Sequence, residues 1–207
     1  TLYVGAPTLR YAVQAAVGMR AGLAGADLRG GDLAGADLRK AHLAGADLRK
    51  AHLAGAYLGG ANLTGAELGD ADLRAANMRE ASLFRAHLAG ANLGGADLAG
   101  ADLAGADLRG ADLHGAHLAG ADLAGADLRK ATLAGADLRR AYLAGADLDD
   151  ADLRAANLRE AILFRANLRG ASLGGAALDL MPCVEHLDQQ ILAALEAGGT
   201  LEMAGWH

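Results

Sequence analysis

AGADLRKAHLAGADLRKAHLAGA, residues 34–56, repeats a five-residue unit made of a small residue, a polar residue, Leu and two variable residues. The pattern runs from Ala21 to Leu180 without an insertion, which gives 32 units in 160 residues. The third position of the unit is Leu everywhere except at Met78, and the first position is Ala everywhere except at Gly31. A period this strict indicates a repeat architecture in which every unit makes the same contacts.

A period of five fits neither a regular helix nor a regular strand. In an α-helix a step of five residues rotates by about 500°, so the Leu side chains would spread around the cylinder. In a strand an odd step moves each Leu to the opposite face. Within one unit, however, Ala and Leu are two residues apart and share one face of a short extended segment. All Leu side chains can therefore be buried together only if the chain bends between units.

The last two positions of each unit are expected to make that bend. Many of the 30 glycines lie at the fifth position and allow the positive φ that a type II turn needs. Asp70, Glu80, Lys50 and Arg140 stand at the same position, and there we expect a second turn type. Turns of about 90° give a four-sided coil of four units, and coils about 4.8 Å apart pair like a parallel sheet. Residues 21–180 therefore predict about eight coils of 20 residues each.

The A(D/N)LXX units resemble the pentapeptide repeat family, and the resemblance covers 160 of the 207 residues. It implies an all-β solenoid, specifically a right-handed quadrilateral parallel β-helix. The four-sided coil agrees with the reasoning from the residues, whereas the right hand comes from the resemblance.

Both flanks of the repeat are expected to be α-helical caps, because the end coils of a solenoid expose backbone groups and Leu side chains. Residues 1–20 form the predicted N-terminal cap, in which apolar residues recur at helical spacing between Thr8 and Gly18. Residues 181–207 form the predicted C-terminal cap and tail. Its helix would place four apolar side chains on one stripe and would either close the rod or mediate dimerisation: Val184, Leu187, Ile191 and Leu195.

The composition favours a protein of the cytoplasm. The net charge is −6, and no apolar run is long enough to span a membrane, so we expect neither direct nucleic-acid binding nor a membrane partner. The first residues lack the charged and apolar regions of a signal peptide. Cys183 is the only cysteine, which excludes an intramolecular disulfide.

Residues 20 apart should lie one above the other, which sorts the outward side chains into four faces. We name each face by its first central leucine: Leu23, Leu28, Leu33 and Leu38. The Leu28 and Leu38 faces carry columns of Arg, whereas the Leu23 face is mostly Ala at the fourth position. Such a smooth strip could contact a partner or a second copy, although Ala is also simply tolerated there. The same stacking predicts that His52, His87 and His117 each lie between two acidic residues.

A 16-residue block occurs twice, 80 residues apart: ADLRAANMREASLFRA at 71–86 and ADLRAANLREAILFRA at 151–166. Each copy combines Arg, Glu and an outward Phe, a composition found at binding hot spots. A duplicated coil block without a function explains the same repeat. If it has a function, the predicted interaction surface is Arg74, Arg79, Glu80, Phe84, Arg85, Arg154, Arg159, Glu160, Phe164 and Arg165.

The sequence holds no catalytic constellation and no cofactor motif. It lacks a phosphate-binding GxxxxGK[ST] loop, an HExxH motif and a nucleophile beside a base. The histidines fall on different faces or at corners without a third ligand, which disfavours a zinc site. We therefore expect no enzyme activity, no cofactor and no bound metal.

Three functional hypotheses remain from the sequence. The first is a protein-interaction scaffold with an unknown protein partner, or a homodimer through the C-terminal helix or the Ala/Gly face. The second follows from the resemblance, in which some members imitate DNA and modulate gyrase or another type II topoisomerase. B-DNA of the rod's length, about 38 Å, would carry on the order of 22 negative charges. The repeat block has 21 acidic against 17 basic residues, so mimicry ranks second. The third hypothesis is a consensus-like sequence without a specialised task.

Overall fold

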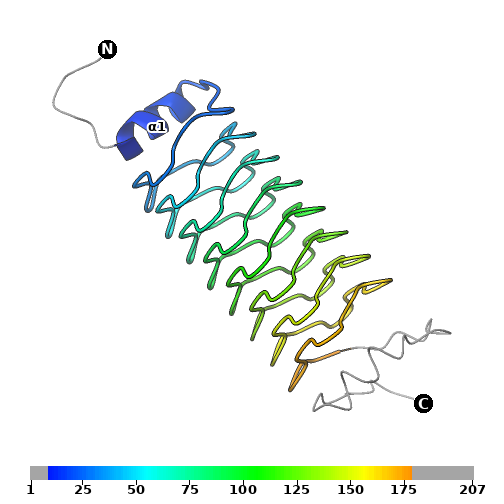
Figure 1. The fold of residues 1–207 in the computed structure, drawn as a ribbon. Coiled ribbons are helices and arrows are strands. Elements are labelled where there is room, and N and C mark those ends of the chain that lie inside the picture. Colours follow the sequence, from blue (N-terminus) through cyan, green and yellow to red (C-terminus); the bar gives the residue numbers. More distant parts are fainter. Residues whose placement is uncertain (1–8, 179–207) are drawn as a thin grey trace.

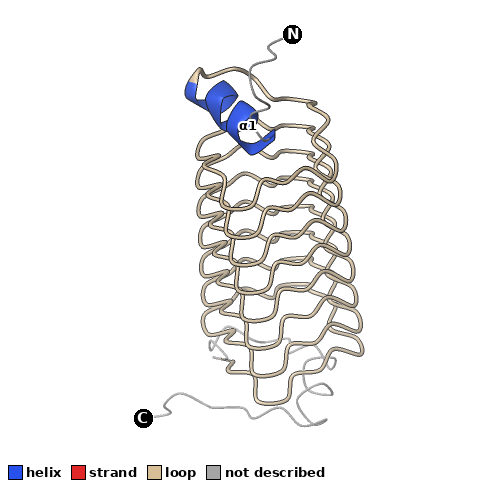
Figure 2. Cartoon of the chain, turned by 90° about the vertical axis from the view of Figure 1, so that its left-hand side faces the viewer, coloured by secondary structure: helices blue, strands red, loops and turns tan. Residues whose placement is uncertain are grey.

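The computed structural model describes residues 9–178, which form a rod of stacked coils with one helix at its N-terminal end (Figure 1). The helix, α1, spans Leu9–Gly18. The repeat follows directly, and its coils stack in the order of the sequence, as the colours of Figure 1 show. Figure 2 shows the same stack of coils with α1 at one end. The helix predicted between Thr8 and Gly18 is therefore confirmed. The predicted C-terminal helix lies outside the described residues.

The coils pair in parallel with a register of 20 residues. The bridges run from Asp27 with Asp47 to Asn157 with Ala177, always between second positions of the unit. Within residues 9–178 every bridge is isolated, and none extends into a continuous strand. The prediction of an all-β solenoid is thus correct in its pairing, but the sides are too short for strands. Each side has only three extended residues before the next turn interrupts the ladder.

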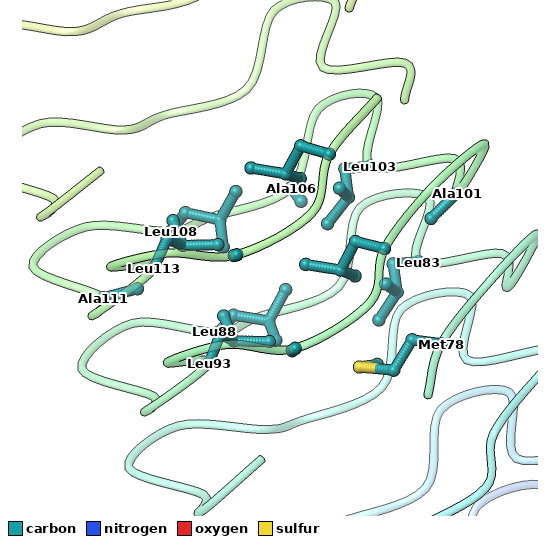
Figure 3. Packing of buried hydrophobic residues seen from close by; sticks show 14 of the residues in the cluster. Met78, Leu83, Leu88, Leu93, Ala101, Leu103, Ala106, Leu108, Ala111 and Leu113 are labelled. Carbon is teal, nitrogen blue, oxygen red and sulfur yellow. The ribbon is translucent and has the colours of Figure 1, made fainter. Parts of the chain in front are cut away.

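The core is a set of stacked apolar columns inside the four sides. From Leu28 to Leu158 the Leu at the third position is fully or almost fully buried, and so is the Ala at the first position from Ala36 to Ala156. Leucines of successive coils lie one above the other, as Leu83 and Leu103 do in Figure 3. Met78 fills a leucine position without becoming exposed. No polar or charged side chain is buried among the described residues, so chemistry is confined to the outer surface.

All corners of the described repeat use one turn type. The fifth position has positive φ whether or not it is Gly: φ is 66° at Gly25, 58° at Lys50 and 55° at Glu80. The fourth position never has positive φ within the described repeat, which is the pattern of a type II turn. The expectation of a second turn type at Asp70, Glu80, Lys50 and Arg140 is therefore wrong.

The reason lies in the ladder between coils. The N–H of Lys50 donates a hydrogen bond of 2.9 Å to the carbonyl of Gly69 in the next coil, as the fifth-position glycines do at their own corners. This bond fixes the backbone independently of the side chain. A non-glycine residue accepts the left-handed conformation at a cost of about 1–2 kcal/mol.

The Asp or Asn at the second position completes the backbone hydrogen bonding. In the unit 46–50, four N–H groups donate to carbonyls of the same turn or of neighbouring coils, and the N–H of Arg49 donates to Asp47 Oδ1. All nineteen Asp and Asn residues at this position accept the N–H two residues ahead. This is the Asx-turn geometry. It explains the preference for Asp and Asn over the longer Glu.

Helix α1 closes the N-terminal end of the rod. Val13 is buried against the first coils, and Arg10 Nη1 donates to the carbonyl oxygen of Ala34 at 3.0 Å. A Cβ at Gly31 would lie 2.5 Å from Leu9 Cδ2. The single exception to Ala at the first position therefore makes room for the cap.

Candidate protein-interaction surface

The Leu28 and Leu38 faces neutralise their own charges. Eight Asp–Arg pairs on these faces and the Leu33 face share a bidentate geometry, in which Arg Nε and Nη2 donate to the two oxygens of the Asp two residues before. Asp47 is typical, with Arg49 Nη2 at 2.6 Å and Arg29 Nε of the previous coil at 3.4 Å. The hydrogen bonds from the Arg49 guanidinium hold the pKa of Asp47 down to about 2. Each such carboxylate is thus already occupied by an arginine.

The histidine columns lie as the register predicts. His52 is bridged to Asp32 and Asp72, His87 to Glu67 and Asp107, and His117 to Asp97 and Asp137. His87 Nε2 lies 4.0 Å from Glu67 Oε1. Across residues 9–178, however, no group of three or more His, Cys, Asp or Glu residues converges as metal ligands would. These columns are part of the exposed surface ladder.

The Leu23 face differs from the other three in both charge and polarity. Its fourth positions are Ala, Thr or Phe from Ala24 to Phe164, and none is charged. Five large apolar side chains are exposed in the described repeat, and four of them belong to this face: Phe84, Tyr142, Ile162 and Phe164, with Tyr57 on the Leu38 face. Phe164 is 65% exposed. The apolar surface that the described repeat offers is therefore concentrated on one side.

The two copies of the duplicated block lie on the same sides of the rod, four coils apart. The ladder places Phe84 and Phe164 in one column, with Ala104, Ala124 and Ala144 between them. Arg85 stacks on Phe84 with its guanidinium 5.0 Å from the ring centre, and Arg165 stacks on Phe164 at 5.1 Å. At about 4.8 Å per coil the two Phe–Arg pairs are about 19 Å apart.

The structure does not bring all ten predicted residues together. Each block spans three successive corners, so Arg74 and Phe84, ten residues apart, lie at opposite corners of one coil. Arg74 and Arg154 are engaged with the Asp two residues before each of them. Arg79 pairs with Asp97. The residues that share the Leu23 face and its two edges are Arg79, Glu80, Phe84, Arg85, Arg159, Glu160, Phe164 and Arg165.

Sequence reasoning missed two members of this surface. Tyr142 and Ile162 are bridged neighbours at the second position of the Leu23 face and are 42% and 49% exposed. Both stand where Asp or Asn would otherwise cap the turn. An apolar residue in a position that favours Asp or Asn was the signal that could have identified them.

The residues of the proposed C-terminal helix, Val184, Leu187, Ile191 and Leu195, lie outside the described residues. Between residues 9 and 178, no helix has the length and apolar character needed to cross a bilayer.

A family model described as pentapeptide repeats matches this chain in eight copies that together span residues 19–179. No curated protein matches the chain.

The chain is also similar to solved structures, of which Alr5209 and HetL are described as pentapeptide repeat proteins. Alr5209 from Nostoc PCC 7120 is 44% identical over 51% of this chain and 84% of its own, with a TM-score of 0.45. HetL from the same Nostoc strain, described as involved in heterocyst differentiation regulation, is 31% identical over 73% and 86%, with a TM-score of 0.26. QnrB1, a plasmid-mediated fluoroquinolone resistance protein, is 19% identical over 83% and 96%, with a TM-score of 0.42. The repeat, the coil register and the family model together show that the chain belongs to the pentapeptide repeat family, whose fold is a right-handed quadrilateral β-helix.

Proposed function

We propose that this protein is a non-enzymatic scaffold that binds another protein through its Leu23 face. One observation supports this most directly: the exposed apolar side chains Phe84, Tyr142, Ile162 and Phe164 gather on the one face whose fourth positions carry no charge. Aromatic and Arg side chains are enriched among residues that dominate binding energy. The regular core holds this surface rigid, so little entropy is lost when a partner binds.

The small side chains between the two Phe–Arg pairs also favour contact. Ala104, Ala124 and Ala144 leave a flat strip on which another backbone or side chain can approach closely. The flanking faces offer less, because their Asp and Arg side chains already satisfy each other, and a partner would have to break those bidentate pairs.

Affinity purification with two matched variants tests this function. Phe84→Ala combined with Phe164→Ala removes both aromatic rings from the Leu23 face, and partners captured by the unchanged protein should be lost. Tyr57→Ala removes an aromatic side chain of 51% exposure from the Leu38 face and should retain them. Equal capture by all three proteins, with unchanged melting temperatures, would contradict the Leu23 face as the binding surface.

DNA mimicry with gyrase as the partner ranks second. It needs an accessible acidic strip, whereas the column from Asp27 to Asp147 holds Arg29, Arg49, Arg109 and Arg129 against its carboxylates. Supercoiling by purified gyrase measures this alternative. Inhibition that disappears when the column is reversed in charge would favour mimicry over the scaffold.

A further inference from the structure

We propose that the partner of the Leu23 face is a second copy of this chain, in a parallel, in-register dimer whose twofold axis runs along the rod. This inference rests on the proposed use of the Leu23 face and names its occupant. The first observation that supports it is the spacing of the duplicated block along the rod. The two Phe–Arg pairs are related by a shift of four coils along the rod, not by a rotation. A partner that meets both in the same way needs the same coil spacing, and a second copy has it.

The charges at the edges of the face are complementary under this symmetry. Glu80 stands at the corner that enters the Leu23 face, and Arg85 stands at the corner that leaves it. The second block repeats this arrangement with Glu160 and Arg165. A twofold axis parallel to the rod exchanges the two edges of the face and leaves each residue at the same height along the rod. It therefore places Arg85 of each copy opposite Glu80 of the other, and Arg165 opposite Glu160.

An antiparallel dimer would place like charges opposite each other. A twofold axis perpendicular to the rod, in the plane of the contact, leaves each edge opposite the same edge of the second copy but reverses the order of the coils. Arg85 would then meet Arg165, and Glu80 would meet Glu160. A parallel dimer slipped by four coils keeps only one of the two block contacts. Charge thus selects both the direction and the register of the contact.

Arg85 and Arg165, which lie over the rings of Phe84 and Phe164, are free to form these ion pairs. The guanidinium of Arg85 lies over the Phe84 ring, 5.0 Å from the ring centre, and its N–H groups can also donate to a carboxylate. Glu160 pairs with Arg140 of its own chain at 2.7 Å, and Arg165 of the second copy would add a second cation to it. At the same level Ile162 and Phe164 add apolar contact area.

We expect this dimer contact to be weak, because its buried area is small and because like charges meet near its axis. Five coils of about 4.8 Å and a side of roughly 16 Å give on the order of 400 Å² per copy, about half of a standard interface. Asp102 and Asp122 lie near the axis and form no ion pair within residues 9–178. Their charges oppose association, so we expect a dissociation constant on the order of 100 µM.

Sedimentation velocity between about 10 µM and about 1 mM tests the dimer, since this range brackets the expected dissociation constant. The unchanged protein should shift from monomer to dimer. Ala124→Arg, halfway between Phe84 and Phe164 on the Leu23 face, should abolish the shift, and Ala134→Arg, the same change on the Leu33 face, should leave it intact. Asp102→Asn with Asp122→Asn keeps the Asx turns and should tighten the dimer several-fold.

A charge exchange tests the symmetry itself. Arg85→Glu should weaken the dimer roughly tenfold, because two ion pairs become repulsive contacts. Adding Glu80→Arg should restore it. Both exchanged residues keep positions whose positive φ already accepts Glu and Arg, so the fold should tolerate them. A protein that stays monomeric to about 1 mM, or a failure of the second change to restore the dimer, overturns the proposal. In either case a different protein lost with Phe84→Ala and Phe164→Ala would still support the scaffold.

Discussion

The Leu23 and Leu28 faces share one backbone and one core, but they present opposite surfaces. From Ala36 to Leu158 both place Ala and Leu inward with the same burial, the same turns and the same ladder. On the Leu28 face, Asp and Arg pair within and between coils, from Arg29 to Asp147. On the Leu23 face, the fourth position is uncharged, and aromatic side chains are left exposed. The comparison shows that the buried first and third positions give both faces one core, while the outward second, fourth and fifth positions give each face its own surface chemistry.

The largest expected effect is one that both faces share. Leu123→Ala under the Leu23 face and Leu128→Ala under the Leu28 face each empty a fully buried site in one of the core columns. Each should lower the free energy of unfolding by about 2–5 kcal/mol, because the column cannot collapse into the cavity. Chemical denaturation measures both. A difference of several kcal/mol between them would show that the faces differ in the core as well as at the surface.

A smaller effect separates the two roles of the second position. Asp122→Ala on the Leu23 face removes only an Asx turn, which is worth about 1 kcal/mol. Asp122→Asn keeps the acceptor oxygen and should restore the stability. Asp127→Ala on the Leu28 face removes the Asx turn together with the bidentate Arg129 pair and should cost more at low salt. Thermal unfolding at two salt concentrations distinguishes them; no loss for Asp122→Ala would contradict the capping role.

The smallest effect is the pH dependence of the Leu28 face. The folded pKa of Asp47 is about 2, below the ordinary value near 3.9, so its contribution to stability is present above about pH 4 and is lost as the pH falls toward 2. Asp47→Asn keeps the Asx turn but removes the titrating group. Stability measured from pH 6 to pH 2 should fall less steeply for this variant. An identical slope would show that the Arg49 pair does not stabilise the fold.

The repeat alone predicts the architecture because each unit must bury the same two side chains. Coil length and stacking register follow from that requirement together with turns of about 90°, whereas the N-terminal helix follows from the apolar spacing between Thr8 and Gly18. The turn at Lys50 could not be predicted from local preference, because a hydrogen bond to the next coil sets its backbone. The capping role of Asp47 and its equivalents could not be predicted either. The N–H of Arg49 is seen to need a side-chain acceptor only when the other four N–H groups of the unit have been assigned to carbonyls.

The interaction surface was predicted only in part for a related reason. Phe84 and Phe164 were evident from the duplicated block, but Tyr142 and Ile162 join them only through the 20-residue register. Arg74 and Arg154 belong to the block in sequence and lie at the opposite corner of the coil in space. Residues therefore join one surface because they share a column of the rod, and closeness in the sequence is a weaker guide.

Site-specific photo-cross-linking tests most directly the claim that the Leu23 face is the contact surface. A benzophenone side chain placed at Ala124 lies on that face, halfway between Phe84 and Phe164. The same group at Ala134 lies on the Leu33 face, two turns further along the chain. Ala124 and Ala134 occupy the same fourth position and are both half-buried. The account predicts a cross-linked product, the covalent dimer, from position 124 and none from position 134. Equal products from both positions, or a product from position 134 alone, would contradict it.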